Sequence, residues 1–103
     1  MSVLLEFAMF PTDKGESVSD YVSRILKVVD EAGFPFTLTA MGTIVEAEEL
    51  DDALKIVKRA YEQIEGDCQR VYSTIKLDIR KGKGCRLKQK VESVEKKVGK
   101  KLT

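Results

Sequence analysis

Apolar and polar residues alternate at the start of the chain, over residues 3–10, and this period of two predicts a β-strand that Pro11 ends. Apolar residues then recur with the spacing of one helix face over residues 18–32, and Gly33 follows as a C-terminal cap. Residues 50–64 carry a second stripe of this kind, with acidic residues in the first turn, where the helix dipole favours them. These segments predict one strand and two amphipathic helices.

Three further elements lie between and after the two helices. Residues 36–40 and 43–47 are short extended runs that predict a β-hairpin, and residues 70–79 alternate again and predict a fourth strand. A thin apolar stripe on a lysine-rich segment predicts a C-terminal helix over about residues 86–98. Because the apolar face of this helix is narrow, we expect it to dock against a sheet or a partner.

The predicted order is therefore β-α-β-β-α-β plus a helix, within one domain over residues 1–103. With right-handed crossovers and both helices on one face, this order predicts an α+β, ferredoxin-like sandwich whose antiparallel sheet has the strand order 4-1-3-2. A swapped strand order is the main alternative.

An antiparallel sheet of this order brings particular strand ends together. The C-terminal end of the first strand lies beside the N-terminal ends of the third and fourth, so we predict a register that places Met9 opposite Thr43 and Ser73. The first helix leaves from the same end, which brings its N-terminal turn, from Ser17 to Tyr21, over the sheet there. Polar groups at the rim of an apolar core are typical of ligand pockets.

The same register makes a prediction for the face of the sheet that the two helices leave open. Glu6 is expected opposite Glu46 and Lys76, with Lys76 bridging the two carboxylates in a structural ion cluster rather than an acid–base pair. Apolar residues share this face, so we expect it to pack against another subunit or against the terminal helix.

No histidine occurs among the 103 residues, which excludes mechanisms that need a Ser-His-Asp triad, a Cys-His pair or a histidine–metal centre. Cys68 and Cys85 match no paired-cysteine zinc spacing, so we interpret both as reduced structural thiols. We therefore expect a protein that is not an enzyme and has no catalytic residue, no metal and no cofactor.

The formal net charge of +1 combines two opposed segments. Residues 1–79 carry eight basic and fifteen acidic side chains, whereas residues 80–103 carry ten basic and two acidic ones. We expect the basic tail to lie against an acidic surface of its own or a neighbouring subunit, with polyanion binding as the alternative. The N-terminus lacks a signal-peptide pattern and no apolar run reaches the roughly 20 residues of a membrane span, so we expect a cytoplasmic protein without membrane contact.

Four motifs in this order resemble the small thiamine-binding-protein family, which includes the tandem-repeat YkoF-like proteins. They are Phe-Ala-Met-Phe-Pro at residues 7–11, Gly-Glu-Ser-Val-Ser-Asp-Tyr-Val at 15–22, Met-Gly-Thr-Ile-Val-Glu at 41–46 and Asp-Cys-Gln-Arg-Val-Tyr-Ser-Thr-Ile-Lys at 67–76. The resemblance implies a ferredoxin-like fold, assembly through sheets into dimers and tetramers, and binding of thiamine or its hydroxymethylpyrimidine part.

Carried over residue by residue, the resemblance implies that Met9 and Thr43 contact the ligand. The tandem-repeat members have Leu at the Met9 position and Ser where this chain has Gly42, so one polar contact of those members is missing here. A cationic thiazolium ring needs an aromatic or acidic neighbour, for which Tyr21 and Tyr72 are the candidates. The candidate ligand-binding residues are thus Met9, Thr43, Gly42, Ser17 and Tyr21.

The leading hypothesis is non-enzymatic binding of thiamine or hydroxymethylpyrimidine by a homo-oligomer, expected to be a tetramer built as a dimer of dimers. One alternative is a nucleic-acid-binding module, although the third strand, Thr-Ile-Val-Glu at residues 43–46, lacks the aromatic motif of RNA-binding sheets. The other alternative is a structural or regulatory oligomer without a ligand.

Overall fold

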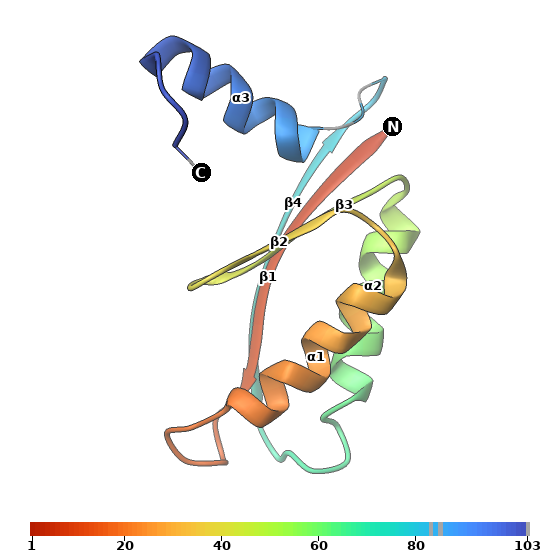
Figure 1. Cartoon of the computed structure of the whole chain (residues 1–103). Coiled ribbons are helices and arrows are strands. Elements are labelled where there is room, and N and C mark those ends of the chain that lie inside the picture. Colours follow the sequence, from red (N-terminus) through yellow and green to blue (C-terminus); the bar gives the residue numbers. More distant parts are fainter. Residues whose placement is uncertain (83, 85, 103) are drawn as a thin grey trace.

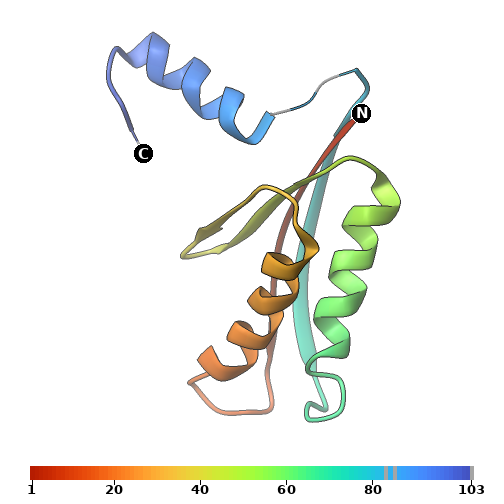
Figure 2. The same cartoon turned by 45° about the vertical axis from the view of Figure 1, so that its right-hand side comes forward.

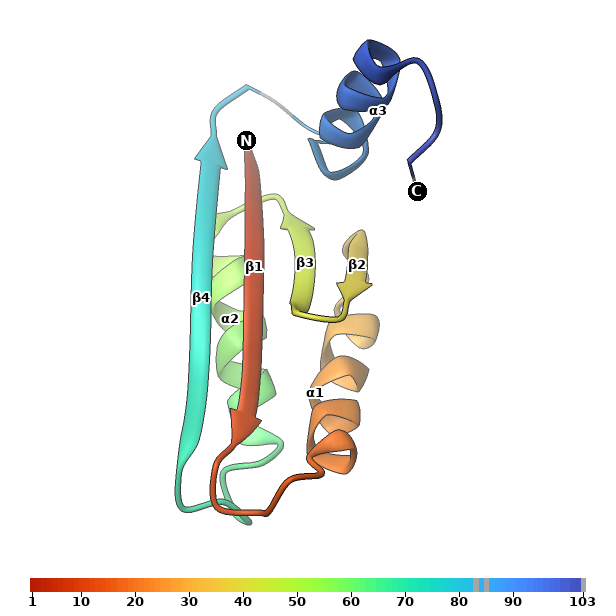
Figure 3. The same ribbon diagram turned by 90° about the vertical axis from the view of Figure 1, so that its left-hand side faces the viewer.

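Four antiparallel strands form one sheet in the spatial order β2-β3-β1-β4 (Figures 1 and 3). The computed structural model describes residues 1–82, 84 and 86–102. Along the chain the elements are β1 (Ser2–Pro11), α1 (Ser19–Ala32), β2 (Phe36–Thr39), β3 (Gly42–Ala47), α2 (Leu50–Glu62), β4 (Val71–Arg80) and α3 (Arg86–Val98). The predicted element order, the strand order 4-1-3-2 and the additional C-terminal helix are confirmed.

The helices α1 and α2 lie side by side on one face of the sheet (Figure 2). Alternate residues of β1, namely Val3, Leu5, Phe7 and Met9, point into this layer and are at most 7% exposed. They pack against Ile25 and Val29 of α1, Ile56 of α2 and other buried apolar side chains. The period of two in β1 and the helical stripes therefore meet in one core, as the sequence pattern predicts.

The register of β1 against β4 agrees with the prediction, because Met9 lies opposite Ser73 and Glu6 opposite Lys76. Against β3 the prediction is wrong by two residues. Thr43 lies opposite Phe7 instead of Met9, and Glu46 lies opposite Leu4 instead of Glu6.

The physical reason for this error is that a shift of two residues leaves every side chain on the same face of the sheet, so hydrophobic alternation does not distinguish the two registers. Close backbone contact does distinguish them. A Cβ atom added at Gly42 would lie 3.0 Å from the carbonyl oxygen of Phe7. The observed register therefore favours glycine at this position, because glycine has no Cβ atom.

The helix α3 crosses the other face of the sheet near the end where the N-terminus lies (Figure 1). It covers Leu4, which is 9% exposed, but not the opposite end of that face, where the rings of Phe10 and Tyr72 lie 5.9 Å apart. The terminal helix thus covers only part of the open face. None of the described helices is long and apolar enough to cross a membrane.

Candidate functional site

A pocket of about 320 Å³ lies between the C-terminal half of β1, the first two turns of α1 and the β2–β3 hairpin. Three of the five predicted site residues line it: Met9 from β1, and Gly42 and Thr43 from the start of β3. The structure therefore brings these three residues to one pocket, although Met9 and Thr43 are not cross-strand partners. They meet because both point toward α1 from neighbouring strands.

The hydroxyl of Thr43 is available to a ligand. Thr43 is 5% exposed, and its hydroxyl makes no hydrogen bond to any other residue in the described part of the chain. The neighbouring Thr39 is different, because its hydroxyl donates to the Gly42 carbonyl at 2.8 Å and accepts from the amides of Met41 and Gly42 at 3.2 and 3.1 Å. Thr39 therefore closes the hairpin turn, while Thr43 supplies the free polar group of the pocket.

The other two predicted site residues, Ser17 and Tyr21, do not line this pocket. Ser17 is exposed in the loop before α1, and Tyr21 packs against the core with the Arg24 guanidinium 4.8 Å above its ring. Their neighbours Val18 and Val22 line the pocket instead. Adjacent helix positions point about 100° apart, so Tyr21 and Val22 cannot face the same way. The apolar pair Val18 and Val22, four positions apart on one face, is the sequence signal that could have identified the lining residues.

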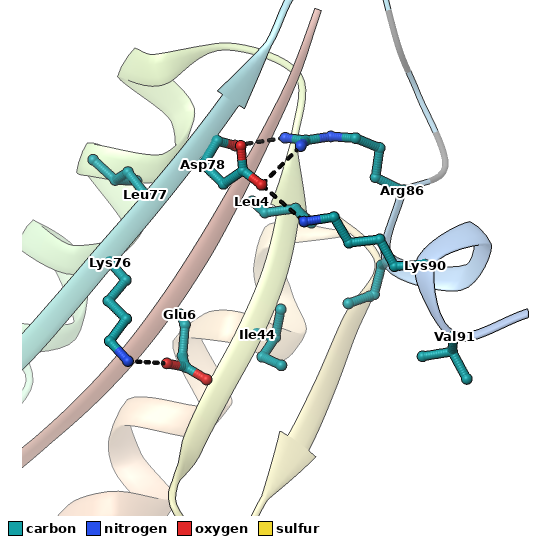
Figure 4. A pocket seen from close by; sticks show the side chains of 10 residues that line it. Leu4, Glu6, Ile44, Lys76, Leu77, Asp78, Arg86, Lys90 and Val91 are labelled. Carbon is teal, nitrogen blue, oxygen red and sulfur yellow. Dashed lines mark hydrogen bonds and ion pairs between the residues drawn. The ribbon is translucent and has the colours of Figure 1, made fainter. Parts of the chain in front are cut away.

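A second pocket, of about 350 Å³, lies under α3 on the open face of the sheet (Figure 4). Asp78 pairs there with Lys90 at 2.8 Å and with Arg86 at 3.0 Å, and Lys76 pairs with Glu6 at 3.5 Å. The predicted bridge from Lys76 to both Glu6 and Glu46 is wrong, because the two-residue shift of β3 moves Glu46 away from it. Each of these charged side chains already has a protein partner, which favours a structural junction between α3 and the sheet.

Sequence reasoning missed the group that anchors α3. The buried Glu46 carboxylate accepts hydrogen bonds from the Ser2 hydroxyl at 2.6 Å, the Arg86 amide at 2.9 Å and the Leu87 amide at 3.1 Å. A residue of β3 thus caps a helix that begins 40 residues later. The signal in the sequence was a lone glutamate between the apolar residues Val45 and Ala47.

The Arg86 side chain completes this anchor. It is 3% exposed and donates to the Ser2 hydroxyl at 3.1 Å, the Ser2 carbonyl at 3.0 Å and the Asp78 carbonyl at 2.5 Å. A buried charge with this many acceptors is tolerated, since its lost hydration is replaced by fixed hydrogen bonds. Polar contacts, rather than the apolar stripe of the helix, therefore fix the N-terminal end of α3 to the sheet.

The stability that this anchor contributes is expected to decrease at acidic pH. Burial by itself raises the pKa of Glu46, but the hydrogen bonds from Ser2, Leu87 and Arg86 outweigh it and hold the pKa below the usual glutamate value. A lowered folded-state pKa stabilises the protein fully above the ordinary value of about 4.3, and this contribution is lost as pH falls through the lower folded value. Calorimetry from pH 7 to pH 2 should show the melting temperature falling in this acid window.

The variant Glu46→Gln, which has no charge to titrate at this position, should show a flatter profile in the same window. Equal slopes for the two proteins would contradict a titrating role for Glu46. The pKa of Asp78 is also lowered, by hydrogen bonds from Lys90 and Arg86, so part of the acid dependence should persist in the variant.

The cysteines and the clusters of acidic side chains are the remaining groups that bear on metal binding. Cys68 is buried as a free thiol, and Cys85 lies outside the described residues. Within residues 1–82, 84 and 86–102, no group of three His, Cys, Asp or Glu side chains is placed to hold a metal ion. The apolar pocket between α1 and the hairpin, with the free Thr43 hydroxyl, has the chemistry to bind a small molecule with a polar edge.

Fold and pocket together define an α+β protein of the ferredoxin-like class with a ligand-sized pocket between its first helix and its hairpin. The model of the thiamine-binding protein family matches residues 5–95, and the chain belongs to this family. The resemblance seen in the four sequence motifs is thereby confirmed.

Relatives from several organisms agree with this assignment. The chain is 36% identical over 95 residues to a UPF0045 protein of Mycobacterium bovis, covering 92% of this chain and 93% of that protein. The crystal structure of a hypothetical protein from Methanocaldococcus jannaschii is similar with a TM-score of 0.81 and 34% identity, over 90% of this chain and 95% of that one.

A structure from Thermotoga maritima, of a protein named for thiamine biosynthesis or salvage, shares the fold. Its TM-score is 0.78 at 18% identity, over 91% of this chain and 99% of that one.

Proposed function

We propose that this protein binds thiamine, or its hydroxymethylpyrimidine part, without catalysing a reaction, and that it does so in the cytoplasm as a homo-oligomer. Membership of the thiamine-binding protein family supports the ligand class. The observation that carries the proposal is that Met9, Gly42 and Thr43 line one pocket, the pocket between α1 and the hairpin.

The pocket suits a flat ring with a polar edge. Met9 and the valines of α1 present apolar surface to the faces of the ring, which stabilises it by removing apolar area from water. The free Thr43 hydroxyl both donates and accepts, so it pairs with a ring nitrogen or with an amino group at the edge. The missing side chain at Gly42 leaves the backbone beside Thr43 open to close approach.

Isothermal titration calorimetry tests the proposal directly. Hydroxymethylpyrimidine and thiamine are titrated separately into the intact protein, and saturable heat with at least one of them is expected. No heat with either compound at millimolar concentration would contradict the proposed function and favour a structural or regulatory oligomer without a ligand.

The variant Thr43→Val is expected to weaken binding about tenfold without unfolding the protein. Valine has nearly the shape of threonine, but it leaves the polar edge of the buried ligand unpaired, a loss of roughly 1–3 kcal/mol. Thr37→Val on β2, outside this pocket, is the matched control and should bind as the parent protein does. Calorimetric affinities decide the point, and unchanged affinity in Thr43→Val would remove this residue from the site.

The proposed homo-oligomer is supported by the edge of the sheet. β4 is ten residues long and, among the described strands, pairs only with β1, so its outer edge is open to another strand. Along it Ile75, Leu77 and Ile79 are 39–47% exposed, an unusual apolar row for the surface of a monomer. A protein that sediments as a monomer at micromolar concentration would contradict the homo-oligomer.

A further inference from the structure

The pocket between α1 and the hairpin has no ionic side chain among the lining residues that the structure describes. Every described residue that lines it is aliphatic, aromatic, methionine, glycine or threonine, with no Asp, Glu, Lys or Arg among them. A ligand bound there exchanges water for apolar surface and for neutral hydrogen-bonding groups. This favours uncharged molecules, because an ion loses its hydration without gaining a counter-charge.

The two tyrosines that the sequence suggests as partners of a cation are engaged elsewhere. The Tyr21 ring holds the Arg24 guanidinium at 4.8 Å, and Arg24 is itself paired with Asp67 at 2.7 Å. Tyr72 packs against Phe10 and, by the alternation along β4, points to the face of the sheet opposite the helices. Neither tyrosine lines the pocket. The described aromatic residues of the lining are Phe7, which is 2% exposed in the core, and Phe10, which packs against Tyr72, so the tyrosine partner that the sequence suggested for a cation is absent.

The dipole of α1 also disfavours a cation in this pocket. Val18 is the N-cap of α1 and lines the pocket, so the pocket lies beside the helix end that carries partial positive charge. A cation held near this end is repelled, whereas a neutral ring that offers an acceptor is not. The volume of about 320 Å³ lies within the roughly 300–1,000 Å³ of ligand pockets.

We infer that this pocket selects the uncharged hydroxymethylpyrimidine over the permanently cationic, two-ring thiamine. The inference rests on the proposed function, and it specifies which of the two ligands that function concerns. In chemical terms the site recognises a neutral aminopyrimidine.

Calorimetric titration of the intact protein with both compounds tests the selection. The expected result is a dissociation constant about tenfold lower for hydroxymethylpyrimidine than for thiamine. If thiamine binds as tightly or more tightly, the selectivity is overturned while the proposed function stands. If neither compound binds, the proposed function is overturned and the selectivity with it.

A charge placed at the mouth of the pocket provides the second arm of the test. Met41 lines the pocket but is 88% exposed in the hairpin turn, so a polar substitution there does not disturb the core. Met41→Glu is expected to raise the affinity for thiamine about threefold to tenfold without a matching gain for hydroxymethylpyrimidine. The gain should shrink with added salt, since the introduced charge is exposed.

Met41→Gln is the matched variant, because it changes the shape of the side chain in the same way without adding charge. A shift in the ratio of the two affinities that occurs only in Met41→Glu shows that the missing counter-charge sets the selectivity. The same ratio in both variants would overturn the electrostatic explanation.

Discussion

Replacing Glu46 by alanine is expected to lower the free energy of unfolding by about 3 kcal/mol, because each buried donor that loses its charged acceptor costs roughly 1–3 kcal/mol. Glu46 is 7% exposed, and its carboxylate accepts from the Ser2 hydroxyl and from the first two amides of α3. Without it, the Ser2 hydroxyl and the amides of Arg86 and Leu87 lose their acceptor, and the N-terminal end of α3 loses its cap. Urea unfolding at neutral pH, followed by circular dichroism, measures the loss.

The control for this prediction is Glu6→Ala on the same face of the sheet. Glu6 is paired with Lys76 at 3.5 Å, but the two side chains are 46% and 74% exposed, so the change should cost less than about 1 kcal/mol. Hydrogen exchange adds a local readout, in which the amides of α3 should lose protection in Glu46→Ala and keep it in Glu6→Ala. Equal destabilisation by the two changes would contradict the anchoring role of Glu46.

The double variant Ile75→Glu/Ile79→Glu is expected to convert the proposed oligomer into monomers at micromolar concentration. Both isoleucines lie on the open edge strand and are 44% and 47% exposed, so the substitution leaves the packed part of the core in place. At an interface between two copies, each glutamate would lose apolar contact and meet like charges from the other copy. Analytical ultracentrifugation of the parent protein and the variant measures the change in mass.

Leu54→Glu is the matched control for the oligomer prediction. Leu54 is 46% exposed, like Ile75, but it lies on α2 and not on the edge strand. This variant should sediment as the parent protein does, because it places a glutamate at an equally exposed apolar position away from the edge strand. If the β4 variant keeps the parent mass, assembly through this edge is wrong.

The structure shows which parts of the candidate site local sequence could predict. Met9 and Thr43 were assigned to one site, and both line the pocket, but they reach it from strands offset by two residues from the predicted register. Ser17 and Tyr21 were chosen from the segment where α1 begins, yet Val18 and Val22 line the pocket. The hydrophobic pattern alone predicts that α1 covers the sheet. Which of two adjacent side chains faces the pocket depends on how the helix is rotated about its axis, and tertiary packing sets that rotation.

The sequence by itself determined the elements, their order and the faces that become buried, because periods of 2 and 3.6 residues record which side chains avoid water. The tertiary structure alone decided the register of β3, which depends on the close approach of Gly42 to the Phe7 carbonyl. It also decided the anchor of α3, in which Glu46 caps amides 40 residues away. Such contacts join groups far apart in the chain, so no local period of apolar residues records them.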